Sequence, residues 1–213
     1  TLRGWDELDI ILFTGDAYID HPSFGPAVIG RSIEAAGYRI AIVPQPDWHG
    51  DFRDFKKLGK PRLFFAVSPG NMDSMVNKYT ANKRLRSEDA YSPDGRHDCR
   101  PDYPSIVYTQ ILKKLFPDVP VVIGGIEASL RRLTHFDYWQ NKLRKSILCD
   151  SGADMLLYGV GAKSILALAE AIEQGRNIKK ITEIPQTVYL SSKDNIQGGI
   201  TDKDIILHSY EEC

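Results

Sequence analysis

The sequence predicts an α/β domain built on a doubly wound, mainly parallel sheet, and three observations point to it. The strand-length runs are apolar throughout rather than alternating, which is typical of strands buried on both faces. Most of them are followed by a segment with helical spacing of its apolar residues. Turn residues close each unit, as expected of alternating strands and helices. The five runs are residues 9–14, 39–43, 62–67, 120–123 and 154–158.

The first two strands each precede a predicted helix. The strand 9–14 (DIILFT) is bounded by Gly15, and the helix 27–37 follows with Ile29, Ile33 and Ala36 on one face and a glycine as its stop. The strand 39–43 (RIAIV) is closed by a proline, and a short, weak helix is expected at 51–57.

The third strand, 62–67 (RLFFAV), is closed by Ser-Pro-Gly, and a long polar segment follows it. The helix 104–116 has proline in its first turn, a position where the missing amide costs nothing. The fourth strand, 120–123 (PVVI), ends in two glycines.

The last two expected helices flank the fifth strand, 154–158 (DMLLY). The segment 136–148 is predicted to be an amphipathic helix, because apolar and basic residues fall on opposite faces at helical spacing. The helix 162–174 shows the strongest periodicity, with Ile165 and Leu168 facing inward, and stops at a glycine.

Residues 8–175 are therefore predicted to form one flavodoxin-like domain with a five-stranded, mainly parallel sheet. Residues 68–103 form an insertion in it, and loops of this length in compact domains are usually functional or disordered. Residues 176–213 are expected to form a β-rich connector. In it, 187–190 and 205–207 are expected to make an antiparallel pair or a small add-on sheet.

Composition excludes several classes of protein. Lys plus Arg is 27 and Asp plus Glu is 28, a net charge of −1, which argues against a strongly basic nucleic-acid module. No apolar run approaches the ~18 residues of a membrane span, and no signal peptide is visible at the amino end. The 3 cysteines are widely spaced and form neither a disulfide framework nor a local metal motif. We expect a cytoplasmic protein with no metal site in this stretch.

The turn after the first strand is the first candidate binding site. Ligands of open parallel sheets bind beyond the carboxyl ends of the strands. Amide donors at a helix amino terminus suit an anion. The alternative is a loop that only caps the helix. The candidate residues in this turn are Asp16, Tyr18, Asp20, His21 and Gly25.

Glycine-rich turns after the fourth and fifth strands extend this candidate site, since glycine lets a ligand approach the backbone closely. The same glycines would also suit any tight turn. The second is an incomplete GxGxxG, with Ser164 in the third glycine position, and no P-loop motif is present. The candidate residues are Gly124, Gly125, Glu127 and Ser129 in the first turn and Gly159 and Gly161 in the second.

The insertion carries cations interleaved with tyrosines, a composition that could contact phosphate or RNA. Glu88, Asp89, Asp94 and Asp98 dilute that charge, so a solvated loop with internal ion pairs is the alternative. Its cations are Lys78, Lys83, Arg84, Arg86, Arg96 and Arg100, to which Arg131 and Arg132 add from the turn after the fourth strand.

Long runs of the sequence resemble YgiQ-type radical SAM proteins, which are described broadly as Fe–S oxidoreductases. The similar runs are 4–9 (GWDELD), 14–25 (TGDAYIDHPSFG), 68–76 (SPGNMDSMV), 91–93 (YSP), 124–132 (GGIEASLRR) and 135–139 (HFDYW). The resemblance implies a larger protein, in which this region precedes a radical SAM barrel whose CxxxCxxC motif binds a 4Fe–4S cluster and S-adenosylmethionine. No such motif occurs in this chain.

The chain is also similar to the cobalamin-binding domains that precede some radical SAM barrels. Its first-strand loop and its two glycine turns occupy the places of their ligand loops. Val160 and Ala162 replace the usual acidic residues of the last turn, and the spacing from His21 to Gly25 departs from the DxHxxG cobalt-ligand motif. The resemblance therefore implies the fold more strongly than it implies cobalamin.

Three functions follow as hypotheses. The first is an accessory domain that helps a radical SAM barrel of the same polypeptide hold substrate or cofactor and is inert alone. The second is a freestanding flavodoxin-like module for a phosphate-bearing small molecule. The third is an RNA-contacting module built on the insertion.

Overall fold

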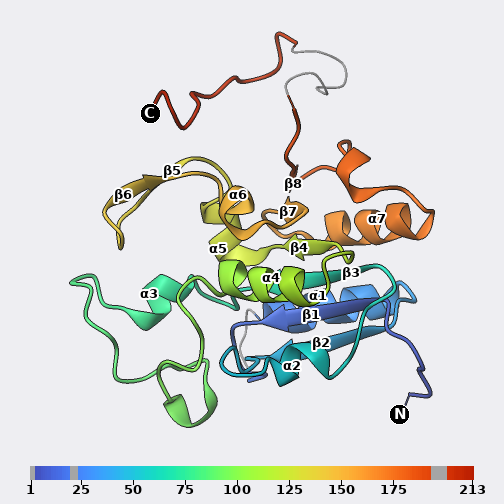
Figure 1. Cartoon of the computed structure of the whole chain (residues 1–213), viewed down its shortest axis with the longest axis horizontal. Coiled ribbons are helices and arrows are strands. Elements are labelled where there is room, and N and C mark those ends of the chain that lie inside the picture. The colour runs from blue at the N-terminus through green and yellow to red at the C-terminus, as the bar shows by residue number, and fades with distance from the viewer. Residues whose placement is uncertain (1–2, 20–23, 193–200) are drawn as a thin grey trace.

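A six-stranded sheet forms the centre of the molecule (Figure 1), in a computed structural model that describes residues 3–19, 24–192 and 201–213. The strand order is β2-β1-β3-β4-β7-β8. The first five strands run parallel, which confirms the predicted doubly wound, flavodoxin-like order. The strands are β1 (Ile10–Thr14), β2 (Ile40–Pro44), β3 (Phe64–Ser68), β4 (Val121–Ile123), β7 (Met155–Leu157) and β8 (Thr187–Val188).

Helices cover both faces of the sheet, as the continuous apolar strands predict. On one face, α1 (Gly25–Ala35) and α7 (Ala162–Glu173) pack over a cluster that includes Ile10 and Leu12. The opposite face lies under α2 (Arg53–Lys56), α4 (Pro104–Leu115) and α6 (Ile147–Ser151), over a cluster that includes Ile11 and Phe13. Alternate residues of β1 thus enter different cores, and each contributes about 1.5–3 kcal/mol by burial. Among the described residues, no helix is both long and apolar enough to cross a membrane.

The predicted helix at 136–148 is wrong. The segment forms a hairpin of β5 (His135–Asp137) and β6 (Lys142–Arg144), and only then begins the short α6. The helical spacing of the apolar residues suggested a buried face, but Phe136 is 60% exposed and pairs across the hairpin with Leu143 rather than entering a core. Asn141 takes a left-handed conformation, with φ 53°, which a helix interior does not tolerate but a tight hairpin turn requires.

The carboxyl-terminal pairing is also different from the expectation. Residues 187–188 do form a strand, β8, but it joins the main sheet antiparallel to β7. Residues 205–207 form no strand, and the side chains of Ile205 and Ile206 are 86% and 74% exposed. The pattern of apolar residues predicted a strand there, but in the described part of the chain residues 205–207 pair with no other strand.

The insertion between β3 and α4 is folded onto the ends of the strands (Figure 1). It contains α3 (Ser74–Lys78) and a 3-10 turn, η1 (Pro93–Gly95). Asp73 caps α3 by accepting hydrogen bonds from two of its backbone amides. The buried guanidinium of Arg100 holds the far end of the insertion, because it bonds carboxylates from two different loops. Like β5–β6, the insertion extends to the left of the sheet in Figure 1.

Acid is expected to destabilise the amino-terminal end of β1. Asp9 is buried there and receives bonds from Arg39 and Arg62. Burial alone would raise the pKa of its carboxyl, but the hydrogen bonds from Arg39 and Arg62 hold that pKa well below the usual value. The ionised form is therefore favoured in the folded state, and its contribution to stability is lost as pH falls from about 4 toward the folded pKa.

We expect Asp9→Asn to lower the free energy of unfolding by about 2 kcal/mol at pH 7, since it removes charged hydrogen bonds. The difference from the wild type should shrink at pH 3. Urea unfolding at both pH values measures it, with Asp47→Asn, at an exposed position, as the control. A difference that is equal at the two pH values would contradict the role of the charge.

Candidate functional site

A cleft of about 230 Å³ opens at the carboxyl ends of β1, β3, β4 and β7, and we call it the strand-end cleft. Its floor is aliphatic, and its mouth is formed by the glycine turns and by the first turns of α1 and α7. The lining residues are Leu12, Gly25, Pro26, Ile29, Ala66, Val67, Ser68, Gly70, Asn71, Val122, Ile123, Gly124, Gly125, Ile126, Leu157, Gly159, Val160, Gly161 and Ile165. Such a surface suits a flat, apolar group held near backbone donors.

Five of the predicted site residues converge on this cleft: Gly25, Gly124, Gly125, Gly159 and Gly161. Two of them leave open space for a ligand, because a Cβ at Gly25 or Gly161 would meet no atom within 4 Å. Gly125 has a different reason to be glycine. Its φ is +83°, and a Cβ there would lie 2.9 Å from Cδ of Pro69.

Asp16 lies behind the cleft rather than in its wall. Its buried carboxylate accepts bonds from Nη1 of Arg100 at 2.6 Å and from the backbone amide of Asn71 at 2.6 Å. Burial raises the pKa of Asp16, and the positive charge of Arg100 opposes that rise. The side chain therefore fixes Asn71, whose Oδ1 in turn accepts a 3.4 Å bond from the amide of Gly25.

Asp89 is the second carboxylate on Arg100. Burial acts to raise its pKa too, but Arg100 and several hydrogen bonds hold that pKa below its usual value. Arg100 lies 3.0 Å from Asp89 and 2.6 Å from Asp16, so one guanidinium bridges two buried carboxyl groups. The three side chains form a rigid support below the loop that carries Asn71.

Glu127 and Ser129 connect neighbouring elements. Glu127 is completely buried, and its Oε1 accepts a 3.0 Å bond from the amide of Ser105 in the first turn of α4. Burial raises the pKa of this carboxyl, and the nearby Asp73 raises it further. Oγ of Ser129 accepts a 3.2 Å bond from the amide of Gly159, which links α5 (Gly125–Leu130) to the turn after β7. Neither residue lines the cleft.

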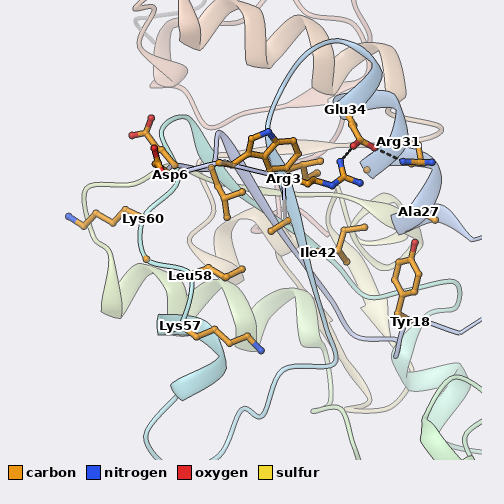
Figure 2. A pocket seen from close by; sticks show the side chains of 17 residues that line it. Arg3, Asp6, Tyr18, Ala27, Arg31, Glu34, Ile42, Lys57, Leu58 and Lys60 are labelled. Carbon is orange, nitrogen blue, oxygen red and sulfur yellow. Dashed lines mark hydrogen bonds and ion pairs between the residues drawn. The ribbon is translucent and has the colours of Figure 1, made fainter. Parts of the chain in front are cut away.

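Tyr18 lies in a different hollow, which we call the edge groove (Figure 2). This groove of about 830 Å³ runs along β2, at the open edge of the sheet. Tyr18 is 59% exposed and packs against Phe24. At the groove's rim, Glu34 already pairs with Arg3 and Arg31 (Figure 2). Although larger, the edge groove lies away from the glycine turns, and so we assign the candidate site to the strand-end cleft.

Asp20 and His21 lie outside the described residues. The part of the chain that the structure describes holds no group of three or more His, Cys, Asp or Glu placed to bind a metal ion. The predicted residues that the structure describes therefore separate into five glycines that line the cleft, the buried Asp16 and Glu127, the half-buried Ser129, and Tyr18 in the edge groove.

Sequence reasoning missed Asn71 and the aliphatic side chains of the cleft. A signal for Asn71 was present, because it follows the end of a parallel strand by three residues, after Ser68-Pro69-Gly70. Ile29 and Ile165 gave none, since their helical periodicity indicated only that they face the core.

Two of the six cations of the insertion, Lys78 and Arg100, form ion pairs within the protein, as does Arg131 after the fourth strand. Lys78 bonds Asp98 and Asp102, Arg100 bonds two carboxylates, and Arg131 pairs with Asp73 across 58 positions of the chain. These contacts fit the interpretation of internal ion pairs. Lys83, Arg84 and Arg86 remain exposed.

Comparison with known proteins gives a family match over the whole chain. The family model described as "Radical SAM N-terminal" matches residues 1–213. A UPF0313 protein of Bacteroides thetaiotaomicron is 63% identical, over 100% of this chain and 36% of that protein. A UPF0313 protein of Pseudomonas aeruginosa is 54% identical, over 92% of this chain and 26% of that protein. The chain thus spans about a third or less of the length of these relatives.

Solved structures of TsrM from Kitasatospora setae, a radical S-adenosylmethionine methyltransferase, share the fold. One, with cobalamin and a 4Fe–4S cluster bound, gives a TM-score of 0.54 at 18% identity, over 84% of this chain and 26% of that chain. Another, with tryptophan and an analogue of S-adenosylmethionine bound, gives a TM-score of 0.55 at 18% identity, over 84% of this chain and 28% of that chain. The likeness confirms the expected cobalamin-binding-domain-like architecture.

Proposed function

This chain belongs to the radical SAM N-terminal family, and from that premise we propose that it is an accessory domain that holds the flat, apolar part of a substrate or cofactor in the strand-end cleft. The observation that carries the proposal is the convergence of the glycine turns on one aliphatic cleft. That cleft lies beside β1 and β3, where the strand order reverses and where open α/β sheets bind their ligands.

The rest of the polypeptide would complete the site. Relatives are about three times longer than this chain. Two apolar side chains that line the cleft are exposed, Ile126 by 40% and Val160 by 82%, and Leu130 at the end of α5 is 60% exposed. Exposed apolar clusters of this kind mark docking surfaces. We propose that the radical SAM barrel packs there, facing the ligand.

The family implies a 4Fe–4S cluster and S-adenosylmethionine for the whole polypeptide, where they supply one-electron chemistry. The residues of this chain would bind and orient what that chemistry acts on or with. The cleft fits only a planar portion of a large cofactor such as cobalamin. Gly25 and Gly161 would admit its edge and Ile29 and Ile165 would contact its face, and the described residues that line the cleft include no histidine.

Gly25→Leu is expected to fill the cleft and weaken binding at least tenfold. A Cβ at this position meets no atom of the described residues within 4 Å, and the backbone φ is not positive, so the new side chain enters open space without backbone strain. Equilibrium dialysis of the full-length polypeptide against hydroxocobalamin and against FMN measures the effect. Val28→Leu, an exposed position on the same helix, is the control.

Two results would contradict the proposal: binding of neither probe by the wild-type polypeptide, or equal affinity in the wild type and in Gly25→Leu. A freestanding module remains the second candidate, because the glycine turns and the aliphatic floor of this chain already form a cleft of about 230 Å³. It predicts that the 213-residue chain binds the probes as tightly as the full-length polypeptide does.

A further inference from the structure

A third hollow, of about 270 Å³, lies between two hairpin tips, and we call it the hairpin hollow. One tip is the turn 80–84 of the insertion, which continues α3, and the other is the turn of β5–β6. Two contacts join the tips. The hydroxyl of Tyr138 donates to the carbonyl of Ala81 at 2.8 Å, and Nζ of Lys83 donates to the carbonyl of Trp139 at 3.2 Å.

Three aromatic rings line this hollow. Tyr79 and Trp139 make one wall, with ring centroids 5.6 Å apart, and Tyr103 lies buried beside them. The two tyrosine rings are fixed by hydrogen bonds of their hydroxyl groups. The hydroxyl of Tyr79 donates to Asp102 at 3.1 Å, and that of Tyr103 donates to Asp137 at 2.5 Å. Preorganised ring faces of this kind favour stacking with another flat ring.

The charges around the hollow favour an anion at its rim. Asp102, the carboxylate that lines it, is already held by Lys78 at 2.9 Å and by Tyr79. Asp98 is held by the same lysine at 2.6 Å. Lys83 lines the rim with its ammonium 4.6 Å from the ring centre of Tyr138, and gives only one of its three protons to the carbonyl of Trp139.

Further cations continue from Lys83 along the same hairpin. Arg84 and Arg86 are both exposed. Nε of Arg86 donates a 3.4 Å hydrogen bond to the carbonyl of Val76. On the other side of the hollow, Arg131 is engaged with Asp73 and with the ring of Tyr103. Exposed cations therefore lie on the insertion, and Lys142 of β6 adds one on the other hairpin.

We propose that the hairpin hollow binds a nucleotide unit, its base stacked on the Trp139–Tyr79 wall and its phosphate on Lys83. The volume is just below the ~300 Å³ at which drug-sized pockets begin, so it takes one ring rather than a dinucleotide. A free mononucleotide and one nucleotide of single-stranded RNA offer the same chemistry. Arg84 and Arg86 lie where the phosphates of an RNA strand would continue.

Fluorescence anisotropy of the full-length polypeptide with a fluorescein-labelled single-stranded RNA decamer tests the proposal, with AMP as competitor. Trp139→Leu should raise the Kd about tenfold, the size that loss of one stacked base produces. Trp139→Phe should stay within about threefold of the wild type, since a ring is kept. Plotted against the logarithm of salt concentration, the logarithm of the RNA association constant falls, and Lys83→Gln should make this negative slope less steep by about 1. Lys179→Gln, at an exposed position elsewhere, should leave the slope unchanged.

The two sources of the nucleotide are separated by competition. Displacement of the RNA by AMP at similar concentration indicates a mononucleotide site, and RNA binding that AMP does not displace indicates a strand. Both results support the hollow provided that Trp139→Leu weakens binding. Binding of neither probe overturns the proposal, as do unchanged affinities in Trp139→Leu and Lys83→Gln. Circular dichroism confirms that the variants fold.

Discussion

Arg100→Leu should lower the free energy of unfolding of this chain by about 3–5 kcal/mol. The guanidinium is 1% exposed and bonds two buried carboxylates, those of Asp16 and Asp89. Leucine would leave both without a counter-charge. The loss should also free the loop that Asp16 holds through the amide of Asn71.

Urea unfolding of the 213-residue chain measures this effect. Arg96→Leu, an exposed arginine of the same insertion, is the matched control and should change stability by less than about 0.5 kcal/mol. An equal, small effect of the two substitutions would show that the buried ion pairs do not hold the insertion.

Gly15→Ala should cost about 3 kcal/mol, the upper end of the range for overpacking. A Cβ at Gly15 would lie 2.3 Å from the carbonyl oxygen of Pro69, a backbone atom that cannot move aside alone. The same oxygen accepts a 3.3 Å bond from Arg100, so the substitution displaces the loop that the ion pairs support.

Gly25→Ala is the control for that substitution, because its Cβ meets nothing within 4 Å and its φ is not positive. Thermal unfolding of both variants is the measurement. The account predicts a large drop in Tm for Gly15→Ala and almost none for Gly25→Ala. Similar Tm values would mean that the loop after β1, which contains Gly15, and the loop after β3, which contains Pro69, do not approach as closely as the structure shows.

The parallel sheet could be predicted from the sequence because its signal is local. Runs such as IILF are apolar on both faces, and each is bounded by glycine or proline. The hairpin β5–β6 could not, because its pattern also fits a helix and only burial decides between the two. Phe136, expected on an inward face, is exposed, and the left-handed Asn141 makes the turn.

The candidate site was likewise predictable only in part: its glycine turns could be predicted from the sequence, and the roles of its buried carboxyl groups could not. Its glycines follow the strands directly, so their convergence on one edge follows from parallel topology. The roles of Asp16 and Glu127 depend on partners 84 and 22 positions away, which no local pattern reveals. Charge composition predicted ion pairs within the insertion, but not that Arg100 would be the buried member that anchors it.

The claim that this chain is an accessory domain is tested most directly by amide hydrogen exchange, measured on the 213-residue chain and on the full-length polypeptide. If the barrel packs over the strand-end cleft, amides of residues 124–130 and 159–162 should exchange at least tenfold more slowly in the full-length polypeptide. Those of residues 53–60, beside the edge groove, should not change. Equal rates at 124–130 and 159–162 in the two proteins would contradict the account.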